Sequence, residues 1–470
     1  MKAIETDILV IGGGPGGYAA AFYAADLGQK VILVEKEDLG GVCLNKGCIP
    51  SKALLHVAHT IEEAELSKAR GVVFGTPKID VDKIRKWKNG IVSKLSGGIG
   101  TLAKARGVEV IEGKGYFESS NECRVETAKG QTHIKFQKAI LATGSRPAVP
   151  AAFDLGNPRV MTSTGALEIE DIPKKLLVVG AGYIGMELGT VYAALGSNVT
   201  MVEAMPEIMA GADRDLVRPL LKVVDEAFES IQMSVKVQKM ATAKKQIKVT
   251  MSDKDGKSKD ELYDRVLVSI GRSPNCEDIG LENTQIKQDD KGFVKVNTKQ
   301  ETDDPNIFAI GDICGGALLA HKASKEARIA VENICGDGAV FEDIHIPAVV
   351  YTDPEIAWVG LTETEAKAQG KKVKVAKFPW AASGRALTFD KAEGLTKLII
   401  EPDTERVLGV GIVGRGAGEL ISEGALAVEM GATAEDLALT IHPHPTLSET
   451  VMESAEAFFG HATHIVSPKK

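Results

Sequence analysis

The chain of 470 residues has no long hydrophobic run and no block of positive charge. No apolar stretch approaches the roughly 20 residues that span a bilayer, so we expect no contact with a membrane. Its 56 Lys and Arg residues are mixed along the sequence with 64 Asp and Glu, which leaves no basic stretch for a nucleic acid backbone. The first residues do not resemble a signal or transit peptide. We therefore expect a cytoplasmic protein that binds neither membrane nor nucleic acid.

Cysteine is scarce, with six in the whole chain, and only Cys43 and Cys48 form a close pair, in "GGVCLNKGCIPSK". A zinc site would need two further ligands at suitable spacing, and the sequence has no second Cys pair or H-x₃-H cluster, so we expect no metal. A structural disulfide over so short a loop would remove only about 2 kcal/mol of unfolded-state entropy. A chain long enough for about three domains does not depend on that contribution. A redox role remains the better interpretation.

The residues after the pair favour the redox role. Proline is tolerated in the first turn of a helix, so Pro50 predicts a helix that begins near Cys48. The positive end of that helix and the charge of Lys52 would stabilise a Cys48 thiolate. A regular helix holds Cα atoms five residues apart at about 8 to 9 Å, and a disulfide needs about 4.4 to 6.8 Å. We therefore expect a distorted segment at 43–48, which Gly47 would allow.

The stretch "DILVIGGGPGGYAAAFYAADLGQKVILVEKE" has the pattern of a dinucleotide-binding strand–helix–strand unit. Gly12 would allow the tight turn, Gly14 would let a pyrophosphate approach the helix N-terminus, and Gly17 would let helix and strand pack closely. The second strand ends at Glu35, which is placed to accept hydrogen bonds from a ribose. One such motif alone is weak support for a nucleotide site.

The same pattern returns in "KLLVVGAGYIGMELGTVYAALGSNVTMVEA", with Gly180, Gly182 and Gly185. Glu203 follows Gly185 by 18 residues, as Glu35 follows the last glycine of the first motif. Two motifs with matched spacing predict that one chain binds two dinucleotides. Glu203 suits a free ribose 2′-hydroxyl, and the following "AMPEIMAG" has no arginine for a 2′-phosphate, so the second site should prefer NAD to NADP.

Other phrases of the sequence complete a family pattern. Apolar strands end in small-residue turns in "KAILATGSRP", "RVLVSIGRSPN" and "NIFAIGDICGGALLAHKA", as expected where backbone closes over a flat cofactor. Together with "CLNKGCIPSK", the two glycine motifs and "HPHPTLSE", they occur in the order typical of the dihydrolipoamide dehydrogenases. The chain resembles that group, the E3 components of 2-oxo acid dehydrogenase complexes, within the pyridine nucleotide-disulfide oxidoreductases. The resemblance covers essentially the whole chain.

This resemblance implies an α/β fold with two Rossmann-like dinucleotide-binding domains, for FAD and NAD, and a C-terminal α+β dimerisation domain. The expected divisions are 1–147 for the first part of the FAD domain, 148–273 for the NAD domain, 274–345 for a central domain that completes the FAD site, and 346–470 for the interface. The residues implied for FAD are Gly12, Gly14, Gly17, Glu35, Lys52, Gly115, Thr143, Gly144, Asp312 and Ala320. Those implied for NAD are Gly180, Gly182, Gly185, Glu203, Val237 and Gly271. Lys52 and Glu187 would form an ion pair beside the flavin.

The resemblance also assigns the chemistry. Cys43 and Cys48 would form a redox disulfide, with Cys48 the thiolate nearer the flavin and Cys43 the thiol that meets the substrate. His444 would be the acid–base group and Glu449 the carboxylate that orients it, as in a His-Pro-x-x-x-Glu dyad. His442 is expected to be structural or at the surface. In the family this dyad serves the cysteines of the partner subunit, so a homodimer is expected.

The implied reaction oxidises protein-bound dihydrolipoamide to lipoamide and reduces NAD⁺ to NADH, with lipoyl-bearing E2 or glycine-cleavage H-protein domains as partners. Glutathione reductase would need cationic residues after Glu203, and mercuric reductase would need a cysteine pair beyond Cys335, the last cysteine. Soluble transhydrogenase lacks the paired cysteines. A non-catalytic assembly subunit would not need the cysteine pair and the dyad to be intact. Lys46 and Pro443 are small departures from the family pattern.

Overall fold

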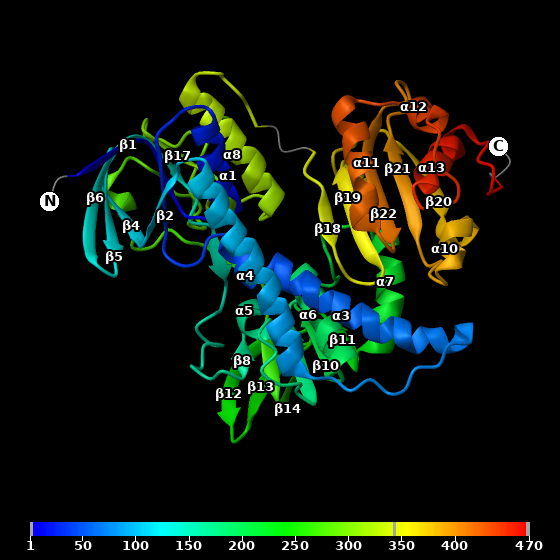
Figure 1. Cartoon of the computed structure of the whole chain (residues 1–470). Helices are drawn as coiled ribbons and strands as arrows, with labels where there is room; N and C mark the ends of the chain where they lie inside the picture. The colour runs from blue at the N-terminus through cyan, green and yellow to red at the C-terminus, as the bar shows by residue number, and fades with distance from the viewer. Residues whose placement is uncertain (1–2, 342–344, 467–470) are drawn as a thin grey trace.

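The computed structural model describes residues 3–341 and 345–466. Figure 1 shows a first nucleotide domain around strand β1 (Ile4–Ile11), a second nucleotide domain around β10 (Asn198–Glu203) and a C-terminal domain around β22 (Val407–Gly414). The described part of the chain starts in the first domain, with β1, and ends beside the C-terminal domain (Figure 1).

The first nucleotide domain contains a sheet of order β3-β2-β1-β6-β5-β4, with β17 beside β6. The other strands are β2 (Val31–Glu35), β3 (Glu109–Glu112), β4 (Lys114–Ser119), β5 (Glu122–Thr127), β6 (Gly130–Leu141) and β17 (Ile307–Ala309), and the helices are α1 (Pro15–Asp26) and α8 (Ala320–Cys335). Strand β1 is parallel to β2 and β6 and buried on both faces, which explains its continuous apolar run. Ile8 and Val10 pack with α1 and α8, while Leu9 packs with β5 on the other face.

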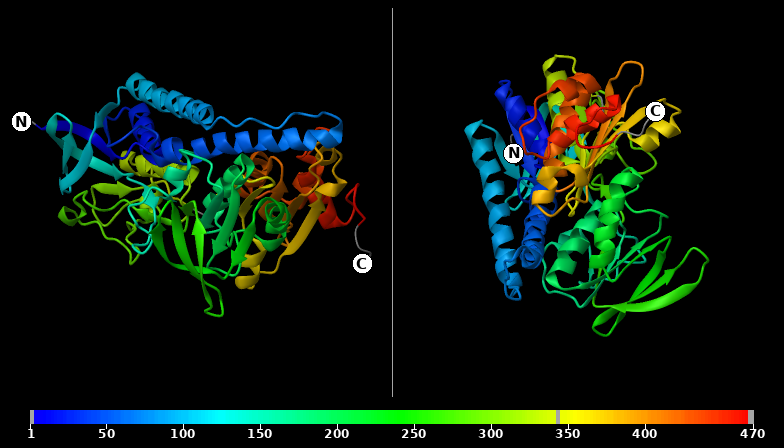
Figure 2. Two further views of the ribbon diagram at one scale, coloured as in Figure 1. Left: turned by 90° about the horizontal axis from the view of Figure 1, so that it is seen from below. Right: turned by 90° about the vertical axis from the view of Figure 1, so that its right-hand side faces the viewer.

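The second nucleotide domain contains a parallel sheet of order β11-β10-β9-β15-β8. Its strands are β8 (Val160–Met161), β9 (Lys175–Val179), β11 (Ser230–Met233) and β15 (Arg265–Val268), and its helices are α5 (Ser163–Ala166), α6 (Tyr183–Leu195) and α7 (Arg214–Ala227). A separate antiparallel sheet projects from it, made of β12 (Lys236–Ala243), β13 (Gln246–Ser252) and β14 (Ser258–Tyr263) (Figure 2). The antiparallel ribbon of β7 (Ser145–Pro147) and β16 (Arg272–Pro274) forms where the chain enters and leaves the second nucleotide domain.

The C-terminal domain is an antiparallel sheet of order β18-β19-β22-β21-β20 with helices packed on it. Its strands are β18 (Ala348–Val350), β19 (Glu355–Gly360), β20 (Lys374–Pro379) and β21 (Leu395–Ile400), and its helices are α9 (Glu363–Ala368), α10 (Gly384–Thr388), α11 (Ala417–Met430), α12 (Ala434–Leu439) and α13 (Glu449–Phe459). Trp380 is fully buried in this core, and its indole N–H donates to Thr396 Oγ1 at 2.9 Å. Two Rossmann-like domains followed by this α+β domain confirm the predicted fold class.

Helix α3 (Cys48–Leu66) connects all three domains. It begins beside the first domain, packs on α6 and ends at the C-terminal domain, where Glu62 and Glu63 pair with Lys391 and Arg415, each at 2.6 Å. Figures 1 and 2 show α3 and α4 (Val81–Ala105) running along the length of the molecule. Helix α3 is therefore held along its length by contacts with all three domains.

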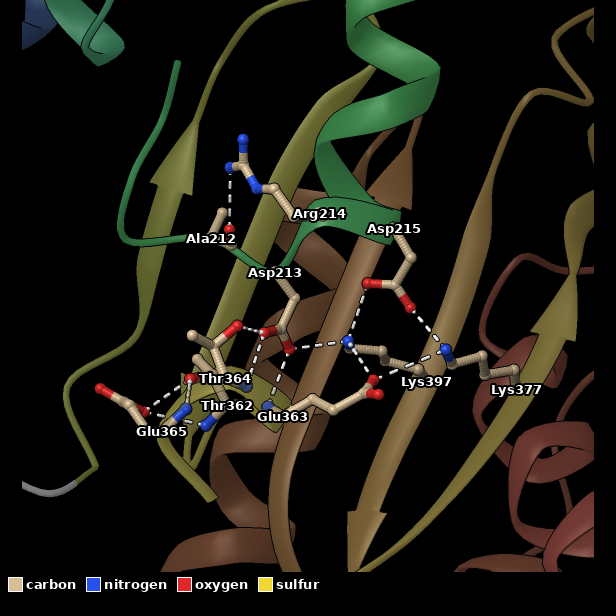
Figure 3. Close-up of polar contacts among 10 residues, drawn as sticks. All are labelled: Ala212, Asp213, Arg214, Asp215, Thr362, Glu363, Thr364, Glu365, Lys377 and Lys397. Atoms are coloured by element: carbon tan, nitrogen blue, oxygen red, sulfur yellow. Dashed lines mark hydrogen bonds and ion pairs between the residues drawn. The ribbon is translucent and has the colours of Figure 1, made fainter. Parts of the chain in front are cut away.

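A buried ion-pair network joins the second nucleotide domain to the C-terminal domain (Figure 3). The ammonium of Lys397, whose side chain is 1% exposed, lies 2.7 Å from Asp213 and 2.8 Å from Asp215, at the start of α7. Asp213 also accepts hydrogen bonds from the backbone N–H groups of Glu363 and Thr364, at 2.9 and 3.0 Å, and so caps α9. The carboxylates of Asp213, Asp215 and Glu363 lie close enough together to hold a cation, and that cation is Lys397.

Candidate active site

A cavity of about 730 Å³ runs between the first nucleotide domain and the start of α3. Its lining brings together twelve of the residues expected from the sequence: Gly12, Gly14, Glu35, Cys43, Cys48, Lys52, Gly115, Thr143, Gly144, Glu187, Asp312 and Ala320. These residues are spread over more than 300 positions in the chain. The cavity therefore unites the first glycine motif and the cysteine pair in one site.

The first glycine motif forms one end of the cavity. Gly12 has φ +103°, and a Cβ there would lie 2.3 Å from the carbonyl oxygen of Ala142. A Cβ on Gly17 would lie 1.7 Å from the carbonyl oxygen of Gly12, so only glycine lets α1 pack this closely against the turn. Gly14 precedes α1, so the first N–H groups of that helix face the cavity. Such a helix end attracts phosphate.

Glu35, the last residue of β2, lines the cavity near the glycine turn. Its side chain is buried, and its carboxylate accepts hydrogen bonds from the N–H groups of Gly13 at 2.6 Å and Glu37 at 2.8 Å. These bonds fix the carboxylate where a ribose attached to the phosphates would lie. The glycine turn, the open helix end and the fixed carboxylate fit a dinucleotide, as the sequence predicts for FAD.

The cavity wall around the predicted Asp312 contains further polar residues, Ser145, Arg272 and Asn275, that the sequence reasoning did not single out. Asp312, on the short helix η3 (Gly311–Cys314), accepts a hydrogen bond from Ser145 Oγ and lies 3.6 Å from the guanidinium of Arg272. Arg272 Nε also donates to Ser145 at 2.7 Å. Asn275 Nδ2 donates to the carbonyl oxygen of Thr143 at 2.8 Å. Ser145, Arg272 and Asn275 occur in the phrases "LATGSRP" and "IGRSPN", so a signal for them was present.

The cysteine pair lies where two helices meet. Helix α2 (Gly41–Lys46) carries Cys43 and α3 starts at Cys48, with the break at Gly47. A Cβ on Gly47 would lie 2.9 Å from the carbonyl oxygen of Val42, so a larger residue would displace the backbone. The predicted distortion between the two cysteines is therefore present, and both side chains line the cavity.

The two thiols have opposite electrostatic environments. A hydrogen bond from Cys43, and after it the charge of Lys52, outweigh the opposing effects of burial and of Glu187 and lower the pKa of the Cys48 thiol to about 7. The same hydrogen bond, together with burial, raises the pKa of the Cys43 thiol well above its usual value. The pair therefore favours a thiolate at Cys48 and a protonated thiol at Cys43.

Lys52 and Glu187 form the expected ion pair at the cavity wall. The ammonium of Lys52 lies 2.8 Å from the carboxylate of Glu187, whose side chain is buried. Ser51 Oγ donates to the same carboxylate at 2.7 Å, and the backbone N–H of Tyr351 donates to it at 3.1 Å. Both oxygens of the Glu187 carboxylate therefore accept hydrogen bonds, and the carboxylate fixes the position of the Lys52 ammonium. Lys52 follows Cys48 by four residues in the sequence.

The second glycine motif repeats the first in a more open setting. Gly180 has φ +102°, and a Cβ on Gly185 would lie 2.1 Å from the carbonyl oxygen of Gly180. Gly182 precedes α6, and Glu203 accepts from the N–H groups of Ala181 and Met205, both at 2.8 Å. Of the remaining residues predicted for NAD, Val237 lies half-buried on β12 and Gly271 precedes β16. Within the described residues, none of these predicted NAD residues lines the cavity.

The predicted acid–base dyad lies on the C-terminal domain. His444 Nδ1 is 2.9 Å from Glu449 Oε1, and the His444 side chain is 76% exposed. Burial raises the pKa of Glu449, but hydrogen bonds from the Thr446 N–H and from His444 lower it more, so the pKa falls below its usual range. His442 is buried against Glu423 at 2.6 Å. In the described part of the chain, neither His444 nor Glu449 lines the cavity.

Comparison with known proteins defines the family. Residues 6–327 match the family described as pyridine nucleotide-disulphide oxidoreductase, and residues 346–455 match its dimerisation domain. The chain belongs to this family. Dihydrolipoyl dehydrogenase of Vibrio cholerae is 46% identical over 469 residues, covering 100% of this chain and 98% of the relative. The enzyme of the same name from Thermus scotoductus is 47% identical over 465 residues, covering 98% and 99%.

Solved structures of the same fold agree with this assignment. LpdA from Mycobacterium tuberculosis has a TM-score of 0.89 at 26% identity, covering 96% of this chain and 99% of that one. The HOCl-induced flavoprotein disulfide reductase RclA from Escherichia coli, as a Cu(II) complex, has a TM-score of 0.87 at 27% identity, covering 97% and 100%. The predicted family, oxidoreductase class and cofactors FAD and NAD are confirmed. None of the described helices is long and apolar enough to cross a membrane.

Proposed function

We propose that the chain oxidises a protein-bound dihydrolipoyl group and reduces NAD⁺ to NADH, with Cys43 and Cys48 as its redox disulfide. The observation that supports this most is a thiol pair with opposite pKa shifts at one end of a dinucleotide cavity. The full-length relatives named dihydrolipoyl dehydrogenase support the substrate. The partners would be lipoyl-bearing domains of E2 or H-protein type, in the cytoplasm.

The exchange step uses the difference between the two thiols. A substrate thiolate attacks the Cys43 sulfur, the Cys43–Cys48 bond breaks, and the electron pair of that bond stays on Cys48. The second substrate thiol then loses its proton and attacks the substrate sulfur of the mixed disulfide. The bond from that sulfur to Cys43 breaks, which releases the cyclic lipoyl disulfide and leaves the electron pair on the Cys43 thiolate. Cys48 is the better leaving group because its pKa of about 7 is the lower of the two. FAD held in the cavity beside the pair would supply the two-electron chemistry that links this dithiol to NAD⁺.

His444 is the base for that second thiol, and Glu449 is its positioning partner. The bond to Glu449 fixes the ring through Nδ1 and leaves Nε2 directed away from the carboxylate, able to take the proton. Because His444 is 76% exposed, its own chain does not enclose it. The dyad would act on the cysteine pair of a second copy.

The surface around the dyad supports a homodimer. Large apolar side chains are exposed on α11, α12 and the segment after them: Leu426 at 62%, Met430 and Leu439 at 75% and Ile441 at 94%. Exposed apolar groups of this kind mark an interface that another surface covers. Residues 346–455 match a dimerisation domain, which supports a second copy of the chain as the partner that covers these side chains.

The other proposed assignments follow the geometry. The cofactor residues named from the sequence would divide between FAD in the cavity and NAD on the second nucleotide domain, with Glu203 on the NAD ribose. The proposed domain limits after residues 147 and 345 fall between sheets. The limit after residue 273 divides β16, and β17 joins the sheet of the first domain.

The decisive assay is NADH formation from dihydrolipoamide and NAD⁺ by the purified yellow protein. Activity with glutathione disulfide and NADPH instead would contradict the substrate. Subunit sharing is tested by co-expressing a His444→Gln chain with a Cys48→Ser chain. Each is inactive alone, and a mixed dimer recreates one complete site, so random assembly should restore about a quarter of the normal activity. No restoration in mixed dimers would contradict a dyad that serves the partner.

A further inference from the structure

Tyr351 brings the C-terminal domain into contact with the redox site. It follows β18 directly, and its ring lies under the ammonium of Lys52, 4.3 Å from Nζ to the ring centroid. Its backbone N–H donates to Glu187 at 3.1 Å. Lys52 of α3, Glu187 of α6 and Tyr351 therefore form one cluster with a member from each domain. Neither the glycine motifs nor the cysteine motif indicates a role for Tyr351.

The two partners of Lys52 affect Cys48 differently. Glu187 attracts the ammonium, but its negative charge also opposes ionisation of Cys48. The ring of Tyr351 attracts the ammonium through its quadrupole and carries no net charge. Burial raises the pKa of the Tyr351 phenol, so the ring stays neutral around pH 7. Tyr351 can therefore hold Lys52 in place without cancelling its effect on the thiolate.

A lysine side chain needs such restraint. Its four-carbon stem has high rotamer freedom, and its ammonium acts as a compact point charge whose effect depends on position. Glu187 binds the ammonium on one side, and the aromatic face of Tyr351 offers a second contact. Lys52 is only partly buried, so loss of one contact would let the ammonium move away from Cys48 into the cavity.

We propose that Tyr351 is a positioning residue whose ring holds the Lys52 ammonium beside Cys48, so that the C-terminal domain controls how readily the redox pair ionises. This rests on the proposed function, in which the Cys48 thiolate is the acting species. The titratable or charged groups that face Cys48 come from four elements: Cys43 of α2, Lys52 of α3, Tyr183 and Glu187 of α6, and Tyr351 after β18.

The test measures ionisation of Cys48 directly. The flavin-loaded protein is reduced with a phosphine and alkylated with iodoacetamide for short times between pH 5 and pH 10, and tryptic peptides are quantified by mass spectrometry. Trypsin cleaves after Lys46 and Lys52, so Gly47–Lys52 carries Cys48 while Cys43 stays on the preceding peptide; in the Lys52→Met variants the Cys48 peptide extends to Lys68. Because only the thiolate reacts, the pH of half-maximal rate gives the pKa of Cys48.

Four variants separate the contributions. Wild type should titrate near pH 7, and Tyr351→Phe, which keeps the ring, should match it. Tyr351→Leu should raise the midpoint by about half a pH unit, as expected for loss of a cation–π contact. Lys52→Met should raise it further. In the double variant Lys52→Met/Tyr351→Leu, the leucine should add no further shift, because Tyr351 acts through Lys52.

The outcomes that overturn the proposal are distinct from a failure of the proposed function. A Tyr351→Leu midpoint equal to that of wild type, or a leucine shift that persists in the Lys52→Met background, would overturn the role of Tyr351 alone. A simple structural role would lower stability in Tyr351→Leu and leave the midpoint unchanged. If wild-type Cys48 titrates near pH 9 and the protein forms no NADH from dihydrolipoamide, both proposals fail together.

Discussion

The two nucleotide folds of this chain have nearly the same local geometry. The first glycine of each motif has φ of +103° at Gly12 and +102° at Gly180. In each fold the acidic residue at the end of the second strand, Glu35 or Glu203, accepts hydrogen bonds from two backbone N–H groups. One N–H belongs to the glycine turn, and the other belongs to the residue two positions after the acidic residue. The same sequence pattern therefore produces the same backbone twice.

What covers each fold is different. In the first, α2, the start of α3 and η3 close over the helix end, and Glu35 is 8% exposed. In the second, the residues beside the motif remain exposed, with Tyr183 at 40%, Met205 at 58% and Ile270 at 44%. A covered fold suits a cofactor that stays bound, and an open one suits a nucleotide that enters and leaves in each cycle. The elements that cover each fold, more than the glycine motif, therefore determine whether its nucleotide stays bound or exchanges.

The attachment of the two folds to the rest of the chain also differs. The first fold gains β17 and α8 from a later segment, which pack on it through apolar contacts. The second meets the C-terminal domain through the ion-pair network of Lys397 with Asp213 and Asp215. The four predictions below test this difference between the covered fold and the open one, or the junction that attaches the open fold.

The largest effect is expected from filling the glycine turns. In Gly17→Val, the new side chain would collide with the carbonyl oxygen of Gly12, and we expect protein that lacks flavin absorbance and is largely insoluble. In Gly185→Val the matching collision is with Gly180, and we expect yellow protein that no longer forms NADH. The measurements are flavin absorbance and NADH formation. Equal loss of flavin in both variants would contradict the division between held and exchanged nucleotides.

The sequence predicted each fold and, through the family resemblance, some residues that cover the first fold, but it did not predict most of the contacts that hold the domains together. The glycine spacings, Glu35 and Glu203 are local features, and the break at Gly47 followed from the reach of a disulfide. By contrast, Arg272 meets Asp312, Tyr351 meets Lys52 and Lys397 meets Asp213 across 40 to about 300 positions. Local periodicity carries no information about such pairs, because they depend on how separate domains pack. The motif phrases indicated where contacts with the cofactor lie, without naming partners.

The next largest effect concerns the junction of the open fold. Lys397→Ala would leave the carboxylates of Asp213 and Asp215 buried without a cation, which costs about 3 to 5 kcal/mol. Lys377→Ala removes a 40% exposed partner of Asp215 and should cost less than about 1 kcal/mol. Urea unfolding followed by tryptophan and by flavin fluorescence should show the Lys397→Ala change before flavin release. Simultaneous changes would show that both folds depend equally on this junction.

The same junction should weaken in acid. Although burial raises the pKa of Asp213, hydrogen bonds from Lys397 and Thr364 lower it to about 2, below its ordinary 3.8. A lowered folded-state pKa stabilises the fold above pH 3.8, by about 2 kcal/mol, and that contribution is lost as pH falls toward 2. The difference in Tm between wild type and Asp213→Asn should therefore shrink across this range. A constant difference would show that the carboxylate charge does not stabilise the junction.

The smallest effect expected is a change of nucleotide preference, and it should occur in only one fold. In Glu203→Gln the side chain keeps its shape and loses the charge that repels a 2′-phosphate. The ratio of kcat/KM for NAD⁺ over NADP⁺ should fall about tenfold, equal to about 1.4 kcal/mol. Glu35→Gln makes the same change in the covered fold, and it should leave that ratio unchanged because the nucleotide there does not exchange. A similar fall in both variants would mean that the two folds do not divide their nucleotides as their coverings suggest.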